Sequence, residues 1–148
     1  MARSTGTFYA QSIERSKTMT NKQSIRALVH RWQEEASRQD AAWKEVPPID
    51  APGLLCYDTP EHQVPLHLSS TYQNWAQRLE SWQLKQTGHN VTCQSLAAWA
   101  REEAQRNRKM MAWKDQPQAL QEARKAMSEA EESIAQQLLA CAQEVGAA

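Results

Sequence analysis

The sequence predicts an all-α protein, a four-helix bundle-like single domain, from three observations. Residues that favour helices, such as Ala, Gln, Glu, Arg and Leu, are abundant, while Gly occurs only 4 times in 148 residues. Apolar residues recur with helical spacing over long stretches. Residues that cap or terminate helices stand at the ends of those stretches. A chain of this length can bury one core.

The beginning of the chain differs from the rest. Before Arg31 the only acidic residue is Glu14, and no apolar period is sustained before Met19. We therefore expect residues 1–20 to be a flexible basic N-terminal segment and residues 21–146 to be a single helical domain.

The first helix is expected at residues 21–45. Thr20 and Asn21 are suitable N-caps, and Pro47 and Pro48 end the helix because proline breaks its hydrogen bonding. One narrow apolar stripe continues for six turns. The stripe consists of Ile25, Leu28, Val29, Trp32, Ala36, Trp43 and Val46.

Residues 47–70 have a different character because five of the 6 prolines lie here. Two apolar runs, residues 54–57 and 64–68, are suited to pairing as a small hairpin across residues 58–63. The alternative is a long irregular connection packed on the bundle. Because loops of this length are often functional, this region is the second choice for a binding surface.

Three further helices are expected at residues 71–86, at residues 92–113 and from Asp115 to about Val145. Gly88 suits a helix C-cap, Asp115 suits an N-cap, and Pro117 fits a first helical turn. Because the connections are short, these three helices should pack as sequential antiparallel neighbours.

The last of these helices carries a heptad pattern. Leu120, Met127, Ile134 and Cys141 recur every seven residues, with small alanines between them. This pattern suits antiparallel packing within the bundle or against a second copy. A homodimer through this helix is the corresponding prediction.

The 6 tryptophans separate into two groups. Trp32, Trp43, Trp75 and Trp82 lie on the apolar faces of their helices and are predicted to be core residues. Trp99 and Trp113 lie nearer the edges of the stripe, and tryptophan is enriched in interface hot spots.

The outer side of the helix at 92–113 is the leading candidate for a binding surface. Its arginines and lysines outnumber its acids, and Arg and Gln are also the residues that read base edges in DNA. Glu102 and Glu103 on the same helix would repel phosphates. The residues predicted to bind a partner or nucleic acid are Gln94, Trp99, Arg101, Gln105, Arg108, Lys109 and Trp113.

Several function classes find no support in the sequence. The formal net charge of zero provides no general attraction to nucleic acid or lipid. No apolar run reaches membrane length, and 3 widely spaced cysteines favour a reduced, cytoplasmic setting. Cys56, Asp58, His62 and His67 are ligand types for zinc, but their spacing matches no closed site.

No phosphate loop, acid/base dyad or nucleophile motif is present, so we expect no enzyme and no cofactor. The sequence predicts a non-catalytic binding protein, such as a regulator, adaptor, inhibitor or small subunit, that contacts a protein partner. The alternative is a helix-turn-helix-like DNA-binding regulator that uses the helix at 92–113.

Overall fold

The computed structural model describes residues 25–47, 49–51, 54–56, 59–84, 89–113 and 115–146. These residues contain four helices and one small hairpin. The N-terminal helix covers residues 25–45, followed by α2 (Pro60–Leu84), α3 (His89–Met111) and α4 (Gln118–Gly146). The all-α fold class is therefore confirmed. Residues 1–20, expected to be flexible, and Gly88, the expected C-cap, lie outside the described residues.

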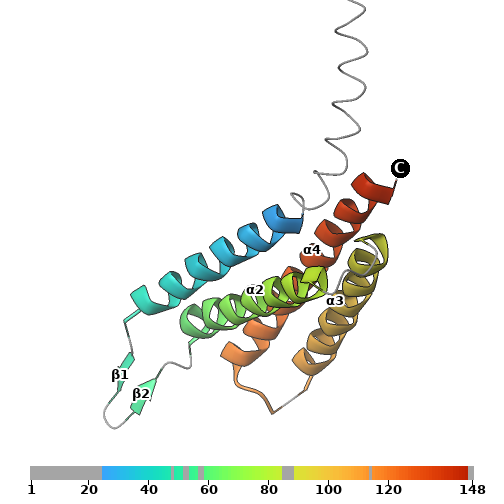
Figure 1. The fold of residues 1–148 in the computed structure, drawn as a ribbon. Helices are drawn as coiled ribbons and strands as arrows, with labels where there is room; N and C mark the ends of the chain where they lie inside the picture. The colour runs from blue at the N-terminus through green and yellow to red at the C-terminus, as the bar shows by residue number, and fades with distance from the viewer. Residues whose placement is uncertain are drawn as a thin grey trace, which may run out of the picture.

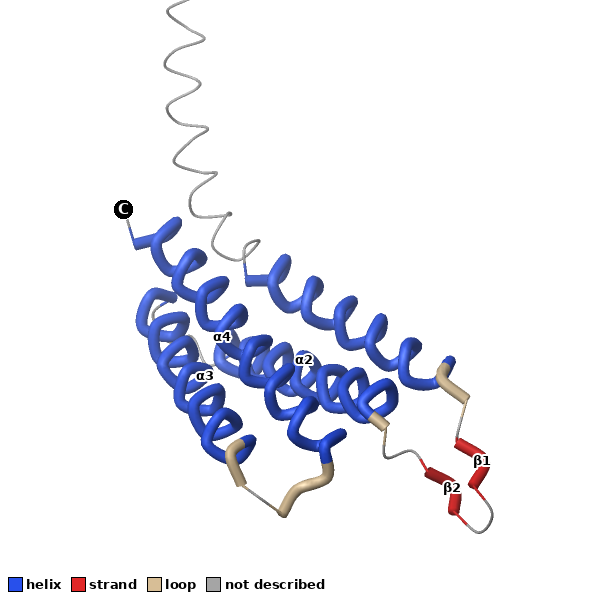
Figure 2. Tube along the Cα trace, turned by 180° about the vertical axis from the view of Figure 1, so that it is seen from behind, coloured by secondary structure: helices blue, strands red, loops and turns tan. Residues whose placement is uncertain are grey.

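The helices form an up-down-up-down arrangement with α4 at its centre. Figures 1 and 2 show α4 between the N-terminal helix and α3, with α2 running in the same direction as α4. The contacts of α4 with α3 are the most extensive, those with α2 are second, and α2 and α3 contact each other little. The expectation that α2 and α3 pack closely as sequential neighbours was wrong, because each packs mainly against α4 and the two meet largely through side chains such as Trp75 and Trp99.

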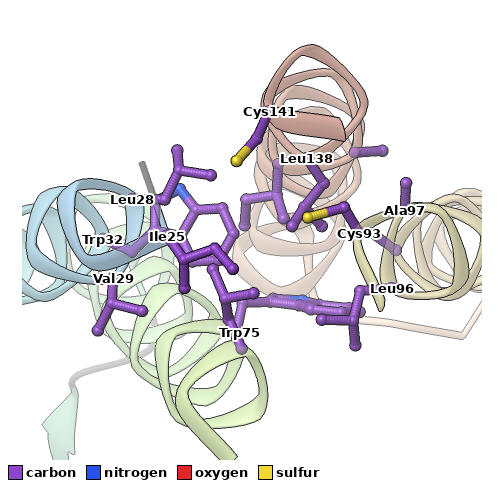
Figure 3. Packing of buried hydrophobic residues seen from close by; sticks show 14 of the residues in the cluster. Ile25, Leu28, Val29, Trp32, Trp75, Cys93, Leu96, Ala97, Leu138 and Cys141 are labelled. Carbon is purple, nitrogen blue, oxygen red and sulfur yellow. The ribbon is translucent and has the colours of Figure 1, made fainter. Parts of the chain in front are cut away.

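The core lies where the other three helices face α4 (Figure 3). Trp32 and Trp75 are each only 1% exposed. Both indole N–H groups bond to α4, Trp32 Nε1 to Gln137 Oε1 at 2.8 Å and Trp75 Nε1 to Glu131 Oε2 at 3.2 Å. A buried indole needs such an acceptor. Polar residues on α4 thus complete the packing of both tryptophans.

The other two predicted core tryptophans are less buried. Trp82 is partly buried and packs against the core cluster. Trp43 lies in the last turn of the N-terminal helix, outside that cluster, and its Nε1 donates to Asp40 Oδ1 at 2.8 Å. The core position predicted for Trp43 was wrong, because the buried part of the apolar stripe ends at Ala36, about two turns before Trp43.

The hairpin forms one segment earlier than predicted. Strands β1 (Ile49–Ala51) and β2 (Leu54–Cys56) pair antiparallel, with Ile49 opposite Cys56, and project beyond the helices (Figure 2). The predicted second strand, residues 64–68, is instead part of α2. The sequence-based start of this helix near residue 71 was wrong by about three turns.

The early start of α2 has a local cause. The carbonyl of Thr59 accepts the amides of His62 and Gln63 at 3.1 and 2.9 Å, and Pro60 occupies the first helical position, where no N–H is needed. His62 Nε2 donates to the carbonyl of Val46 at 2.9 Å, so Nδ1 accepts the Thr59 hydroxyl at 2.7 Å. This buried histidine ties α2 to the end of the N-terminal helix. Pro65 lies inside α2 and costs only one backbone hydrogen bond.

The heptad residues of α4 point into the bundle. Ile134 and Cys141 are buried, as are the intervening alanines Ala123 and Ala130. This finding accounts for the pattern by packing within one chain. Among the described helices, none combines the length and apolarity required to cross a membrane.

Candidate functional site

A buried polar junction joins α2, α3 and α4. Glu131 of α4 is 4% exposed, and its two carboxylate oxygens accept hydrogen bonds from two helices. Asn107 Nδ2 of α3 donates to Oε1 at 2.6 Å, and Trp75 Nε1 of α2 donates to Oε2 at 3.2 Å. Next to it, the Ser128 hydroxyl donates to the carbonyl of Ala104 at 2.8 Å. Buried carboxylates are rare in cores and need such partners.

The surroundings of Glu131 favour its neutral form. Burial is the main cause that raises the pKa of this carboxyl group from 4.5 to about 7. The bonds from Trp75 and Asn107 and the charge of Arg78 act in the opposite direction, and the nearby carboxylate of Glu103 adds to the rise. The group therefore titrates near neutral pH.

Arg78 covers the side of this junction where α2 meets α3. Its guanidinium carbon lies 4.5 Å from the centroid of the Trp75 ring and 4.2 Å from that of Trp99. The two indoles meet edge to face at 5.5 Å and 71°. Trp99 Nε1 donates to Glu103 Oε1 at 3.3 Å, which also accepts from Arg106 at 3.2 Å. Long side chains thus fill the seam between α2 and α3, whose backbones contact each other little.

The residues predicted from sequence do not form one patch. Gln94, Arg101, Gln105, Arg108 and Lys109 are all exposed and follow one another at helical spacing on the outer face of α3, which we call the outer α3 face. Trp99 is two residues from Arg101, or about 200° around the helix.

Trp99 is half-buried against Trp75 and Arg78. The structure therefore brings the five polar residues together and places Trp99 in the α2–α3 seam.

Trp113 follows the end of α3 and is 60% exposed. It is the one large hydrophobic side chain classed as exposed among the described residues. Its carbonyl accepts hydrogen bonds from Gln116 and Gln121 at 3.4 and 3.5 Å. Arg124 Nε in turn donates a hydrogen bond to Gln116 Oε1 at 3.0 Å. Gln116 also donates to the carbonyl of Met110. These bonds fix the backbone from which the exposed indole projects.

Cys93 and Cys141 are buried and face each other across α3 and α4 (Figure 3). The hydrogen bond with Cys141 and burial both raise the pKa of the Cys93 thiol. A thiol that stays protonated is a poor nucleophile.

A groove of about 320 Å³ lies between the N-terminal helix and α2, lined by Gln33, Ala36, Ser37, Asp40, Ser69 and Gln73. The Asp40 carboxylate within it accepts hydrogen bonds from Lys44 Nζ and Trp43 Nε1, both at 2.8 Å, and these bonds lower the pKa of Asp40. In the part of the chain that the structure describes, no three His, Cys, Asp or Glu residues are placed to hold a metal ion. Of the four residues weighed as zinc ligands, the side chains of Cys56 and Asp58 lie outside that part.

Sequence reasoning missed Glu131, Asn107 and Arg78. A signal for the first two was present, because Glu131 lies between Met127 and Ile134 on the inward stripe of α4, and Asn107 continues the alanine stripe of α3. A polar residue at an inward position indicates a buried network. No local pattern marks Arg78, whose partners come from its own helix and from α3.

Comparison of the chain with models of protein families, with curated proteins and with solved structures gives no match.

Proposed function

We propose that this chain is a non-catalytic binding protein that docks a protein partner through the outer α3 face and Trp113. The exposed Trp113 is the observation that carries the proposal. Burial of a large exposed indole against a partner is favourable because apolar surface is removed from water. Tryptophan and arginine are also the residues that most often dominate binding energy. The bonds from Gln116 and Gln121 restrain the Trp113 backbone, so less backbone entropy is lost when a complex forms.

The charges of the outer α3 face favour an acidic partner. Arg101, Arg108 and Lys109 are exposed, and none of them forms an ion pair with another described residue. By contrast, Arg106 on the same helix is paired with Glu103. Unpaired cations on one face favour encounter with a negatively charged surface.

The same unpaired cations are the observation that favours DNA as a second candidate. Against it, Glu102 is exposed on α3, where it would repel phosphates. The opposite side of α3 is covered by α4. An apolar pocket on a protein would bury the indole of Trp113, whereas DNA would not.

Affinity capture from native lysate tests the proposal with two variants, Trp113→Ala and the double variant Arg101→Glu/Arg108→Glu. The matched control is Arg26→Glu/Arg31→Glu, which reverses two exposed charges on the N-terminal helix. We expect a protein recovered with the parent and the control to be lost from both α3 variants. Equal recovery with all four chains would contradict the proposal.

A mobility-shift assay with DNA over a salt series distinguishes DNA binding from protein binding. Binding through phosphates weakens steeply with salt and depends on Arg101 and Arg108 but not on Trp113.

A further inference from the structure

Arg78 contacts two indoles, and its hydrogen-bond donors have no acceptor among the residues that the structure describes. The guanidinium carbon lies 4.5 Å from the centroid of the Trp75 ring and 4.2 Å from that of Trp99. An indole ring attracts the charge of a guanidinium but supplies no oxygen acceptor for its five N–H groups. Arg78 is only partly buried, so a ligand can approach these N–H groups from solvent.

The carboxylates near Arg78 are engaged elsewhere. The oxygens of Glu131 accept from Trp75 and Asn107, and Glu103 Oε1 accepts from Trp99 and Arg106. Within residues 25–47, 59–84, 89–113 and 115–146, no hydrogen bond or ion pair is formed by Arg78. A planar donor group is thus held in place, half-desolvated and unpaired.

We propose that Arg78, seated on Trp75 and Trp99, is a receptor for a carboxylate group carried by an acidic peptide segment. A carboxylate matches the planar guanidinium with two parallel N–H···O bonds. The indole walls would cover the methylene groups of an aspartate or glutamate side chain.

The charge around the site favours a carboxylate over a phosphate. Glu103 and Arg78 both act electrostatically on Glu131, so both carboxyl groups lie near Arg78. Two nearby acidic groups penalise a phosphate dianion about twice as much as a carboxylate monoanion, because Coulomb repulsion scales with charge. This site is separate from the outer α3 face, since Trp99 and Arg101 lie about 200° apart around the helix. It therefore stands whether or not the proposed function is correct.

The probe is acetylated tetraglutamate amide, with tetraglutamine as the neutral peptide and inorganic phosphate as the second anion. Indole N–H signals of the folded, full-length chain are followed by two-dimensional NMR during each titration. We expect tetraglutamate to shift the signals of Trp75 and Trp99 saturably, with a Kd in the range of about 1 mM, and to leave Trp32 unchanged. Tetraglutamine should shift none of them.

Variants assign the effect to Arg78. Arg78→Gln should abolish the saturable shift, and Arg78→Lys should weaken binding at least about fivefold, because an ammonium keeps the charge but lacks the planar fork. Arg31→Gln removes the same charge from an exposed position on the N-terminal helix and should bind like the parent. If Arg78→Gln does not fold, Arg78→Lys alone carries the comparison.

Three results would overturn the inference. The first is no saturable shift of Trp75 or Trp99 with tetraglutamate up to about 10 mM. The second is an equal loss of binding in Arg31→Gln, which would show general electrostatic attraction. The third is tighter binding of inorganic phosphate than of tetraglutamate, which would assign the site to phosphate.

Discussion

Replacement of Glu131 with glutamine removes a buried carboxyl group that titrates near neutral pH. A carboxyl pKa raised from 4.5 to about 7 means that the folded protein retains a proton that the unfolded chain has lost in this window. The stability contributed by the group is fully present below about pH 4.5 and is lost as pH rises through about 7. At about 1.4 kcal/mol for each pH unit, the loss is about 3 kcal/mol. Because Glu131 is 4% exposed, solvent screening reduces this figure little.

Glutamine is the suitable substitute because it resembles the protonated acid. Its carbonyl oxygen can accept from Trp75 Nε1, and its amide can donate to Asn107 after the Asn107 amide rotates to present its oxygen. The protonated carboxyl requires the same rotation, since an O–H needs an acceptor. Both bonds are therefore retained, and the variant differs from the parent mainly by its inability to ionise.

Urea unfolding at about pH 4.5, 6 and 8, followed by circular dichroism and tryptophan fluorescence, measures the effect as a difference between the two proteins. We expect Glu131→Gln to gain about 3 kcal/mol relative to the parent between the lowest and highest pH. Glu129→Gln removes the same charge from an exposed position two residues earlier on α4 and controls for net charge. A difference between Glu131→Gln and the parent that stays constant with pH would refute the reasoning, because the folded carboxyl would then keep its ordinary pKa.

Three other substitutions test the packing. Trp32→Ala should destabilise the fold by about 3–5 kcal/mol in urea unfolding, because it opens a core cavity, whereas the exposed Trp113→Ala should change stability by less than about 0.5 kcal/mol. A large loss in Trp113→Ala would show that its indole packs in the fold. His62→Ala should cost about 2 kcal/mol in the same assay, because it leaves the carbonyl of Val46 and the Thr59 hydroxyl without their partner. An unchanged midpoint would remove His62 as the link between α2 and the N-terminal helix.

The sequence predicted best those features that depend on spacing along one helix. Ile25, Leu28, Val29, Trp32 and Ala36 were expected to share a face, and all five are buried. Such a stripe is visible without a partner, because the helical period itself aligns the residues. The ends of α3 were predicted within about three residues, and the start of α4 within a similar margin, for the same reason.

Features that depend on which helices meet were not predicted. Nothing in the spacing of α2 and α3 shows that both pack mainly against α4. The prolines at positions 60 and 65 suggested a loop, but the Thr59 cap and Pro60 in the first turn permit a helix there. The Glu131 network joins residues 24 and 56 positions apart along the chain. Its members carry the local signal of a polar residue on an inward face, but their pairing is a property of the packed bundle. The binding role of the outer α3 face stays a prediction.

Trp75 belongs to both the junction and the seam, and this sharing predicts how Arg78 and Glu131 influence each other. The Trp75 N–H bonds Glu131, its ring carries Arg78, and the charge of Arg78 lowers the pKa of Glu131. A carboxylate bound to Arg78 would cancel part of that charge and favour the protonated form of Glu131. By linkage, protonation of Glu131 must then favour the carboxylate in turn.

The other groups acting on the pKa of Glu131 are Asn107 and Glu103 of α3. The charge of Glu103 favours the protonated form of Glu131, as a carboxylate bound to Arg78 would. We therefore expect the affinity for tetraglutamate to fall about fivefold, the lower end of couplings between sites, as pH rises from about 6 to about 8. Glu131→Gln should bind with an affinity that does not change over this range. Binding that weakens with pH equally in Glu131→Gln would place the titrating group elsewhere, and binding independent of pH in the parent would show that Arg78 and Glu131 act independently.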